Sequence, residues 1–492
     1  NFVGFSSVSL ELQHITPPNE DSDIPNIREP YTVTEKADGM RKLLYIDKGG
    51  KVYLIDVNMN IQFTGMISSN LDYHESLLDG EHVLHDKTGN YINYYMAFDA
   101  YYIARRDIRS LPLAVIPEGS KGNKTRAVHM HDIVDNATFQ SVIGDRLPLT
   151  IQEKTFYLSD SEEIFQNCNA ILSKVKDGLF VYETDGLMFT PSDKGVGSNT
   201  INEVLPPKKM TWDRSFKWKP PEFNTIDFLV TTQKTESGED LVGNIFQEGI
   251  SVDKSSQLTQ YKTLILRVGF SERMHGYLNP CEDIIQGNIP NRHDRDNRDK
   301  YKPVPFYPTD PRPNYPAYLC NIVLEESDGV KYMLIEDHKE SFEDGTIVEF
   351  RFDSLREPGY QWVPIRVRKK KTAEYKAGKN NFGNAYHVAS SVWRSIHNPI
   401  TERMMRTGSD IPSDLTNDDV YYNRKKNSTI TRALRDFHNL FVKRILILNV
   451  SNRGDTLMDQ SVGKGGDIPK WITAKLSFVF GIDISLDNIE NR

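Results

Sequence analysis

One short run, Lys36-Ala37-Asp38-Gly39-Met40-Arg41, constrains this chain more than any other stretch. It lies between two segments that alternate in the manner of strands. A tight turn there places a lysine amine, a backbone open to close approach and an arginine on one loop. Four fixed residues in six recur by chance, so the meaning of the run depends on the motifs that come after it along the chain.

Length and composition bound the rest of the interpretation. A chain of 492 residues is too long for one hydrophobic core and predicts about three domains. The net charge of −8 argues against a surface that is basic throughout, but it leaves room for a local basic groove such as residues 366–371. The three cysteines, Cys168, Cys281 and Cys320, lie far apart, which suits a reducing compartment and predicts no metal centre built on cysteine.

The two ends of the sequence give no sign of membrane targeting. No apolar run is long enough to cross a bilayer, and the first residues lack a charged segment followed by an apolar one. The chain begins with Asn1 instead of methionine, which predicts that it starts inside a longer polypeptide.

The pattern of strands and helices predicts several units. Residues 31–65 alternate like strands, further strands are expected at 77–83, 94–102, 178–182 and 186–189, and a more helical region is expected over 106–175. A second β-rich unit without long helices predicts a small barrel over about 225–368. We therefore expect domains at residues 1–221 and 222–372, a connector at 373–415 and a last domain at 416–492.

The residues of the first unit indicate a covalent reaction at a nucleotide phosphate. A lysine is protonated at its ordinary pKa, and burial or a nearby cation such as Arg41 favours the neutral, nucleophilic amine. Attack by Lys36 on the α-phosphate of a nucleotide would give a lysyl-nucleotide and release pyrophosphate. Such a step needs cations on the phosphates and a metal held by carboxylates.

Candidates for these roles come after Lys36 in order. They are two acids (Glu81 and Asp185), one ring able to stack on a base (Phe98), two lysines that alternate with Trp218 (Lys217 and Lys219) and two arginines on one strand face (Arg366 and Arg368). Taken alone, each of these residues could simply belong to a turn, to the hydrophobic core or to the solvated surface. Their joint occurrence in one order favours catalysis.

This order resembles the covalent nucleotidyltransferase superfamily of mRNA capping guanylyltransferases and of ATP- or NAD-dependent ligases, over about residues 30–370. The resemblance implies an α+β nucleotidyltransferase domain followed by a β-barrel OB-fold domain. It assigns Lys36 as the nucleophile, Arg41 as a ribose and phosphate contact, and Phe98 as the ring over the base. Glu81 contacts ribose or metal, and Asp185 links metal and phosphate.

The same resemblance implies that Lys217 and Lys219 bind the α-phosphate, while Arg366 and Arg368 engage the β- and γ-phosphates. The family motif at the two arginines usually continues with Asp, where this chain has Lys369. Two details favour the capping branch over ligases: Asp185-Gly186-Leu187 replaces the usual Glu-Gly, and Lys217-Trp218-Lys219-Pro220 matches capping enzymes. The nucleotide implied is GTP, with Mg²⁺ or Mn²⁺.

A second constellation lies near the end of the chain. Residues 459–467 form a glycine-containing loop after an expected strand and before an expected helix, and Asp483 ends the next strand. Such loops let a cofactor approach the backbone, and an acid on the next strand suits ribose hydroxyls.

This segment resembles the start of cap guanine-N7 methyltransferases, which have an α/β Rossmann-like fold and bind S-adenosylmethionine. The residues implied for that cofactor are Lys443, Ser461, Gly463, Asp467 and Asp483. The family loop usually reads Gly-Cys where this chain has Ser461-Val462. Because the segment is short, we expect no N7-methylation by this chain alone.

The two resemblances in one chain together imply a multifunctional viral mRNA capping enzyme of the large DNA virus group. It would transfer GMP from GTP, through lysyl-GMP, to a 5′-diphosphate RNA end. Expected partners are an RNA triphosphatase domain before Asn1 and other transcription or capping subunits, and the expected location is the host cytoplasm, the viral factory or the virion. The alternatives are an ATP-dependent polynucleotide ligase and a catalytically silent RNA-binding scaffold.

Overall fold

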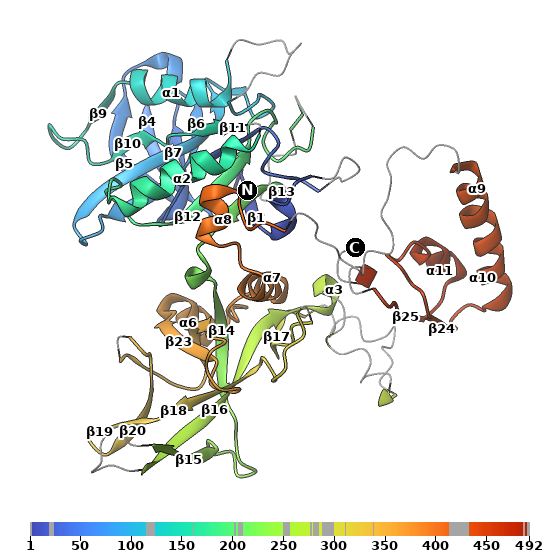
Figure 1. The fold of residues 1–492 in the computed structure, drawn as a ribbon. Coiled ribbons are helices and arrows are strands. Elements are labelled where there is room, and N and C mark those ends of the chain that lie inside the picture. The colour runs from blue at the N-terminus through green and yellow to red at the C-terminus, as the bar shows by residue number, and fades with distance from the viewer. Residues whose placement is uncertain are drawn as a thin grey trace. The chain divides into compact units, whose positions relative to one another are not determined.

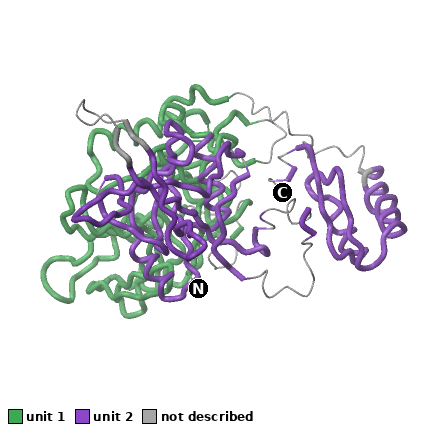
Figure 2. The backbone as a smooth tube through the Cα atoms, turned by 90° about the horizontal axis from the view of Figure 1, so that it is seen from below, with its two compact units in different colours: residues 1–18, 24–224, 398–413 green, residues 19–23, 225–397, 414–492 purple. Residues whose placement is uncertain are grey.

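The computed structural model describes residues 2–18, 24–114, 124–159, 161–200, 203–204, 210–248, 256–275, 278, 285–287, 300–309, 311–337, 339–412, 432–485 and 488–489. Its elements are labelled in Figure 1. Cys281 and residues 413–431, which include the expected start of the last domain, lie outside the described residues. The chain divides into two units: one comprises residues 1–18, 24–224 and 398–413, and the other comprises 19–23, 225–397 and 414–492 (Figure 2).

The first unit contains two sheets. The five-stranded sheet has the order β1-β13-β12-β2-β11, formed by Phe5–Ser9, Met210–Trp218, Thr184–Pro191, Tyr31–Ala37 and Tyr157–Ser159. The other sheet has the order β10-β7-β6-β3-β4-β5-β9, formed by Thr150–Glu153, Tyr91–Ile103, Ser76–His85, Met40–Ile46, Lys51–Asp56, Ile61–Ser68 and Phe139–Ser141, and β8 (Arg106–Asp107) pairs with β7.

The Lys36–Arg41 run links these two sheets. Lys36 lies near the end of β2 in the first sheet, Asp38 and Gly39 make the turn, and Arg41 lies in β3 of the second sheet. A Cβ on Gly39 would lie 2.8 Å from both the Glu81 side chain and the His82 carbonyl oxygen, so the turn sits tightly against β6. The motif is thus the point at which the chain crosses between sheets.

Three helices cover the first unit. Helix α1 (Arg126–Asn136) packs on β7 and β10, and α2 (Glu163–Lys176) packs on β2 and β11. The short α8 (Glu402–Thr407) packs on α2, and the Ile400 carbonyl accepts a 2.9 Å hydrogen bond from the Trp218 indole. Part of the segment expected to be a connector is therefore integral to this unit.

The strand expected at 178–182 is wrong. Residues 177–183 form turns and bends, and β12 starts at Thr184. Tyr182 is buried with Ala37, Val83 and Met96, and its hydroxyl donates to Glu35 Oε1 at 2.9 Å. The aromatic residues of this stretch fill a small core cluster, so their alternation reflects packing and not strand pairing.

The second unit is built on a mostly antiparallel sheet. Its order is β15-β16-β14-β22-β23, formed by Val242–Glu248, Ser256–Phe270, Thr225–Thr232, Thr346–Phe352 and Trp362–Val367, with β17 (Lys302–Pro305) and β18 (Leu319–Val323) also paired to β16. A smaller sheet contains β19 (Glu325–Ser327), β20 (Val330–Leu334) and β21 (Ser341–Phe342). Helices in the described residues between 225 and 397 include α3 (Glu272–His275), α6 (Lys369–Lys376) and α7 (Tyr386–His397). The OB-fold assignment stays a prediction.

The C-terminal segment has the element order that its sequence predicts. A helical run comprises α9 (Arg432–Phe437), a π-helical turn η5 (His438–Lys443) and α10 (Arg444–Val450). Strand β24 (Thr456–Asp459) is followed by α11 (Ile468–Ala474) and β25 (Phe478–Gly481), and the two strands pair in parallel. Membership in a methyltransferase domain stays a prediction.

Candidate active site

Lys36 forms the centre of a compact charge cluster in the first unit. Its Nζ donates to Asp185 Oδ1 at 2.6 Å, and Lys219 Nζ lies 2.6 Å from Asp185 Oδ2. Although burial opposes the charged carboxylate, Lys36 and Lys219 hold the pKa of Asp185 below its ordinary value. One carboxylate is therefore ionised between two ammonium groups.

Backbone contact between β12 and β13 brings these residues together. Asp185 lies near the start of β12. Gly186, next to it, has a φ of +142°, and a Cβ there would lie 1.9 Å from the Trp218 carbonyl oxygen. Only glycine permits the two strands to meet at this point, which places Asp185 within reach of Lys219.

Lys217 adds a third cation. Burial, followed by the positive charges of Lys219 and Lys36, lowers the pKa of Lys217 below its ordinary value. Three ammonium groups around one carboxylate leave a local excess of positive charge. Such a cluster is suited to a phosphate group, which would relieve the repulsion between the lysines.

Glu81 faces the same region from β6. Burial raises the pKa of Glu81 to about 7, and the charges of Lys154 and Lys36 oppose the shift. The residue lies inside β6, where it is paired in register with Arg41 of β3. A carboxyl group with this pKa can be neutral or charged near pH 7.

Arg41 is already engaged within the protein. Its Nε donates to Asp79 Oδ1 at 3.0 Å, Nη2 pairs with Asp79 Oδ2, and Nη1 donates to the Phe5 carbonyl oxygen. Tyr101 also donates to Asp79, at 2.5 Å, and the guanidinium lies 5.7 Å from the centre of the Phe98 ring. Burial opposes the charge of Arg41, but Asp79 raises its pKa above the ordinary value.

The sequence did not predict the two residues, Asp79 and Tyr101, that hold Arg41 in place. The pair Asp79-Gly80 is typical of a turn, yet Asp79 is a fully buried strand residue. Tyr101 belongs to an aromatic strand and carries no separate signal. Both roles depend on the pairing of β6 with β7, which no local pattern specifies.

A second missed group lies directly behind Lys36. Lys154, only 6% exposed, donates to the Glu35 carbonyl oxygen at 2.8 Å, and its Nζ lies 3.6 Å from Glu35 Oε1. Thr34 and Tyr182 donate to the two oxygens of the Glu35 carboxylate, at 2.8 and 2.9 Å. This buried network fixes the backbone immediately before Lys36. The adjacency of Glu35 to Lys36 is the one signal of it in the sequence.

The two predicted arginines lie in the second unit. Arg366 lies in β23, but Arg368 follows the end of that strand, so the expectation that both lie on one strand face is wrong for Arg368. Arg366 Nε and Arg368 Nη1 nevertheless donate to the same oxygen of Glu349, at 2.8 and 3.2 Å. Arg368 also pairs with Asp227 at 3.3 Å, and Lys371 pairs with that same Asp227 oxygen. These cations are held by acids of their own unit.

The predicted cofactor loop in the C-terminal segment is closed by local contacts. The Gly463 amide donates to Asp483 Oδ2 at 2.7 Å, and Ser485 and Asn488 donate to Asp483 Oδ1, both at 3.0 Å. Asp467 pairs with Lys443 at 3.1 Å and with Lys470 at 2.5 Å. The Ser461 amide donates to Asp459, which shapes the loop. Four of the five predicted residues thus contact one another in pairs, Gly463 with Asp483 and Lys443 with Asp467.

Among the described residues, no group of three or more His, Cys, Asp or Glu side chains is placed to hold a metal ion. Asp185 and Glu81 are two acids whose pKa values the charge of Lys36 lowers. A divalent cation would therefore need ligands from a bound substrate as well as from the protein. Within the described part of the chain, no helix is both long and apolar enough to cross a membrane.

Comparisons with known proteins show which proteins this chain resembles. Residues 4–220 match the family described as mRNA capping enzyme, catalytic domain. The chain is 26% identical to a probable mRNA-capping enzyme of Acanthamoeba polyphaga mimivirus, over 97% of this chain and 40% of that protein. It is 22% identical to an mRNA-capping enzyme of African swine fever virus, over 92% of this chain and 43% of that protein.

A shorter stretch of the chain is similar to a different enzyme. Over 78 residues, 14% of this chain and 21% of the other protein, identity is 32% to mRNA cap guanine-N(7) methyltransferase 1 of Arabidopsis thaliana. The chain spans about two fifths of the length of its viral relatives. The resemblance to viral mRNA capping enzymes that the sequence predicts is confirmed, and residues 4–220 are the part of the chain that matches the model of the capping-enzyme catalytic domain.

Proposed function

We propose that this chain is an mRNA 5′-capping guanylyltransferase that works through a covalent Lys36–GMP intermediate. The observation that carries the proposal is the Lys36–Asp185–Lys219 cluster, with both contacts at 2.6 Å, inside the segment that matches the capping family. A nucleophilic amine, phosphate-binding cations and an acid meet there.

In the first step, Lys36 Nζ attacks the α-phosphorus of GTP. A nitrogen–phosphorus bond forms, the bond from the α-phosphorus to the bridging oxygen breaks, and pyrophosphate leaves with that electron pair. Asp185 lies where it can pass the proton of the Lys36 ammonium to solvent. Lys217 and Lys219 stabilise the charge that develops on the phosphate oxygens.

In the second step, a terminal phosphate oxygen of a 5′-diphosphate RNA attacks the phosphorus of Lys36–GMP. The nitrogen–phosphorus bond breaks, Lys36 regains a proton, and the product is GpppN-RNA. The Glu35–Lys154 network keeps the backbone before Lys36 in place through both steps. Positioning of this kind lowers the entropic cost of reaching the reactive geometry.

Mg²⁺ or Mn²⁺ fits this site only together with substrate. Mg²⁺ in phosphoryl-transfer enzymes is often held by one or two carboxylates and by phosphate oxygens. Asp185 and Glu81 are the residues that would hold it, and its chemistry is neutralisation of charge on the reacting phosphates. Glu81 would have to be ionised for this role, which its pKa of about 7 allows.

The proposal extends to the rest of the chain. The second unit would be an OB-fold domain whose Arg366 and Arg368 exchange Glu349 for the β- and γ-phosphates of GTP. The C-terminal segment would begin an S-adenosylmethionine-dependent N7-methyltransferase domain. An RNA triphosphatase domain and other capping subunits would be partners, and the enzyme would act in the host cytoplasm or viral factory.

The direct test is a label-transfer experiment. The chain is incubated with α-³²P-GTP or α-³²P-ATP and a divalent metal, then run on a denaturing gel. We expect an acid-labile, base-stable band from GTP alone, absent from Lys36→Ala and present in Lys51→Ala, which alters an exposed lysine of β4. A band from ATP alone identifies a ligase. If neither nucleotide gives a band, the proposal fails and the catalytically silent RNA-binding scaffold is the remaining alternative.

A further inference from the structure

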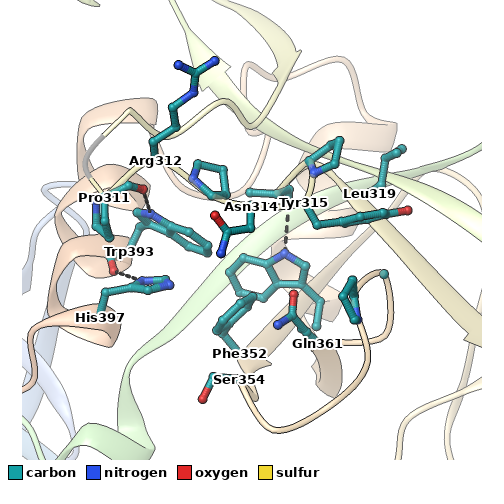
Figure 3. Close-up of a pocket in the computed structure, with 16 residues that line it drawn as sticks. Pro311, Arg312, Asn314, Tyr315, Leu319, Phe352, Ser354, Gln361, Trp393 and His397 are labelled. Carbon is teal, nitrogen blue, oxygen red and sulfur yellow. Dashed lines mark hydrogen bonds between the residues drawn. The ribbon is translucent and has the colours of Figure 1, made fainter.

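A cavity of about 400 Å³ in the second unit is walled in part by α7 and by the indole rings of Trp362 and Trp393 (Figure 3). The two tryptophans are only 3% and 1% exposed. Their N–H groups donate to the carbonyl oxygens of Ala317 and Pro311, both at 2.8 Å. Because these rings are already packed and hydrogen-bonded, the cavity offers a ligand no open aromatic face.

The Arg41 side chain, in contrast, contacts both sheets of the first unit. Arg41 belongs to β3 of the larger sheet, where Asp79 of β6 accepts from its Nε and Nη2. Its Nη1 donates to the carbonyl oxygen of Phe5, the first residue of β1 in the five-stranded sheet. One guanidinium group is therefore held by two sheets at once.

The segment from Phe2 to Phe5 encloses this guanidinium. The Arg41 Cζ atom lies 5.6 Å from the centre of the Phe2 ring and 5.5 Å from that of the Phe5 ring, within the range of cation–π attraction. Both rings are buried. Gly4 lies between them in sequence, and a Cβ there would be 2.7 Å from Arg41 Nη2. A side chain at position 4 would therefore displace the guanidinium.

The same strand also contacts the strand that carries the candidate phosphate-binding lysines. Strand β1 pairs in parallel with β13, and Ser9 at the end of β1 is in register with Lys217. The Phe5 ring packs edge-on against Trp212 of β13, with the ring centres 4.6 Å apart. Because β1 contacts Arg41 at its first residue and Lys217 at its last, its placement couples the positions of these two cations.

We propose that residues 2–5 are positioning residues of the nucleotide site, which hold Arg41 in the orientation in which it contacts GTP. The inference rests on the proposed function, because the resemblance to capping enzymes gives Arg41 its contact with the ribose and phosphate. The sequence motifs begin only at Lys36, so this role is visible in the fold and not in the pattern. A side chain already held in its binding orientation loses less conformational entropy when the ligand binds.

The direct test is Gly4→Ala in the full chain, with Lys36–GMP formation followed over a range of α-³²P-GTP concentrations. We expect the half-saturating GTP concentration to rise roughly tenfold or more, since a misplacement of about 1 Å can cost on the order of a hundredfold. The maximal rate should change little, because Arg41 would bind GTP equally before and during the reaction. Gly144→Ala is the matched control, since a methyl group there meets no atom within 4 Å, and it should behave as the parent does.

A second background separates positioning from a general effect on folding. Arg41→Lys keeps a positive charge opposite Asp79 but lacks the Nη2 atom that the new methyl group would meet. In that background, Gly4→Ala should raise the half-saturating GTP concentration by less than about twofold, because both substitutions act on one contact. An effect of equal size in the two backgrounds overturns the proposal, since residue 4 would then act on the fold without Arg41.

Phe2→Leu keeps the proposal testable if Gly4→Ala does not fold. Leucine retains an apolar contact in the core but removes the ring beside the guanidinium. We expect the half-saturating GTP concentration to rise roughly two- to fivefold, which corresponds to the loss of one cation–π contact. A Phe2→Leu variant with the GTP dependence of the parent would contradict the positioning role.

Binding of a fluorescent GTP analogue, measured by anisotropy, separates this inference from the proposed function. Gly4→Ala should weaken this binding by the same factor as it raises the half-saturating GTP concentration. If the parent binds the analogue but forms no GMP adduct, and Gly4→Ala weakens the binding, only the proposed function fails. If Gly4→Ala forms the adduct with the GTP dependence of the parent, only the inference fails. A parent chain that neither binds the analogue nor forms the adduct overturns both.

Discussion

The Lys36 site and the loop at residues 459–467 are comparably clear in sequence but differ in how the fold supports them. At the Lys36 site, polar and charged side chains are joined across strands that are far apart in sequence, as in the Asp79–Arg41–Tyr101 contacts among β6, β3 and β7 of one sheet. At the loop, Asp483 is satisfied by neighbours within about twenty residues of sequence, and Asp467 pairs with Lys443 and Lys470. We therefore expect a substitution to lower the stability of the protein most where the side chain contacts strands that are far apart in sequence.

Removal of a buried partner at the first site should have the largest effect on stability. Asp79 is fully buried, and Asp79→Ala leaves the Arg41 guanidinium without its main partner. We expect a loss of about 3–5 kcal/mol in the free energy of unfolding, measured by chemical denaturation and by hydrogen exchange of β6 peptides. The double variant Arg41→Met/Asp79→Leu removes both charges and should recover much of the loss. A loss under about 1 kcal/mol in the single variant would show that the pair is effectively solvated.

Strand spacing gives the next largest contrast. A methyl group at Gly186 would lie 1.9 Å from the Trp218 carbonyl oxygen, whereas one at Gly466 would meet no atom within 4 Å. We expect Gly186→Ala to destabilise the protein by roughly 2–4 kcal/mol and to suppress formation of the Lys36–GMP adduct, because β12 and β13 must separate. Gly466→Ala should change stability by less than about 0.5 kcal/mol. Equal effects of the two substitutions, in denaturation and label transfer, would contradict the comparison.

These two contrasts show what sequence could and could not predict. The order of the charged motifs specified Lys36, Asp185, Lys217 and Lys219, because each lies in a local pattern of residue types. The roles of Asp79 and Lys154 were not predicted. They depend on which strands pair, and no short window of sequence contains Asp79 together with Arg41, or Lys154 together with Glu35. The strand predicted at 178–182 was wrong for a related reason. Aromatic residues buried in a local cluster alternate along the sequence in the same way as residues buried on one face of a sheet.

The titration of Glu81 tests how dry the first site is. Its pKa of about 7 lies above the ordinary 4.5, so the folded state favours the protonated form. The stability from this group is therefore fully present below about pH 4.5 and is lost as pH rises through 7, by roughly 2–3 kcal/mol. Glu81→Gln keeps the neutral form and should remove that dependence, so its stability relative to the parent should rise between pH 5 and pH 8. Parallel pH profiles for the two proteins would mean that Glu81 is solvated.

The smallest effect is expected in the C-terminal segment, from the acid that sequence placed in the cofactor loop. Asp467→Ala removes ion pairs to Lys443 and Lys470, of which Lys443 is about half exposed. Partly solvated pairs contribute little, so we expect a change of about 1 kcal/mol or less in the free energy of unfolding, measured by chemical denaturation and by hydrogen exchange of α11 peptides. Asp79→Ala in the same assay is the buried counterpart. A loss at Asp467 as large as at Asp79 would mean that the loop is a structural element, and that its acids are held for folding and not kept free for a ligand.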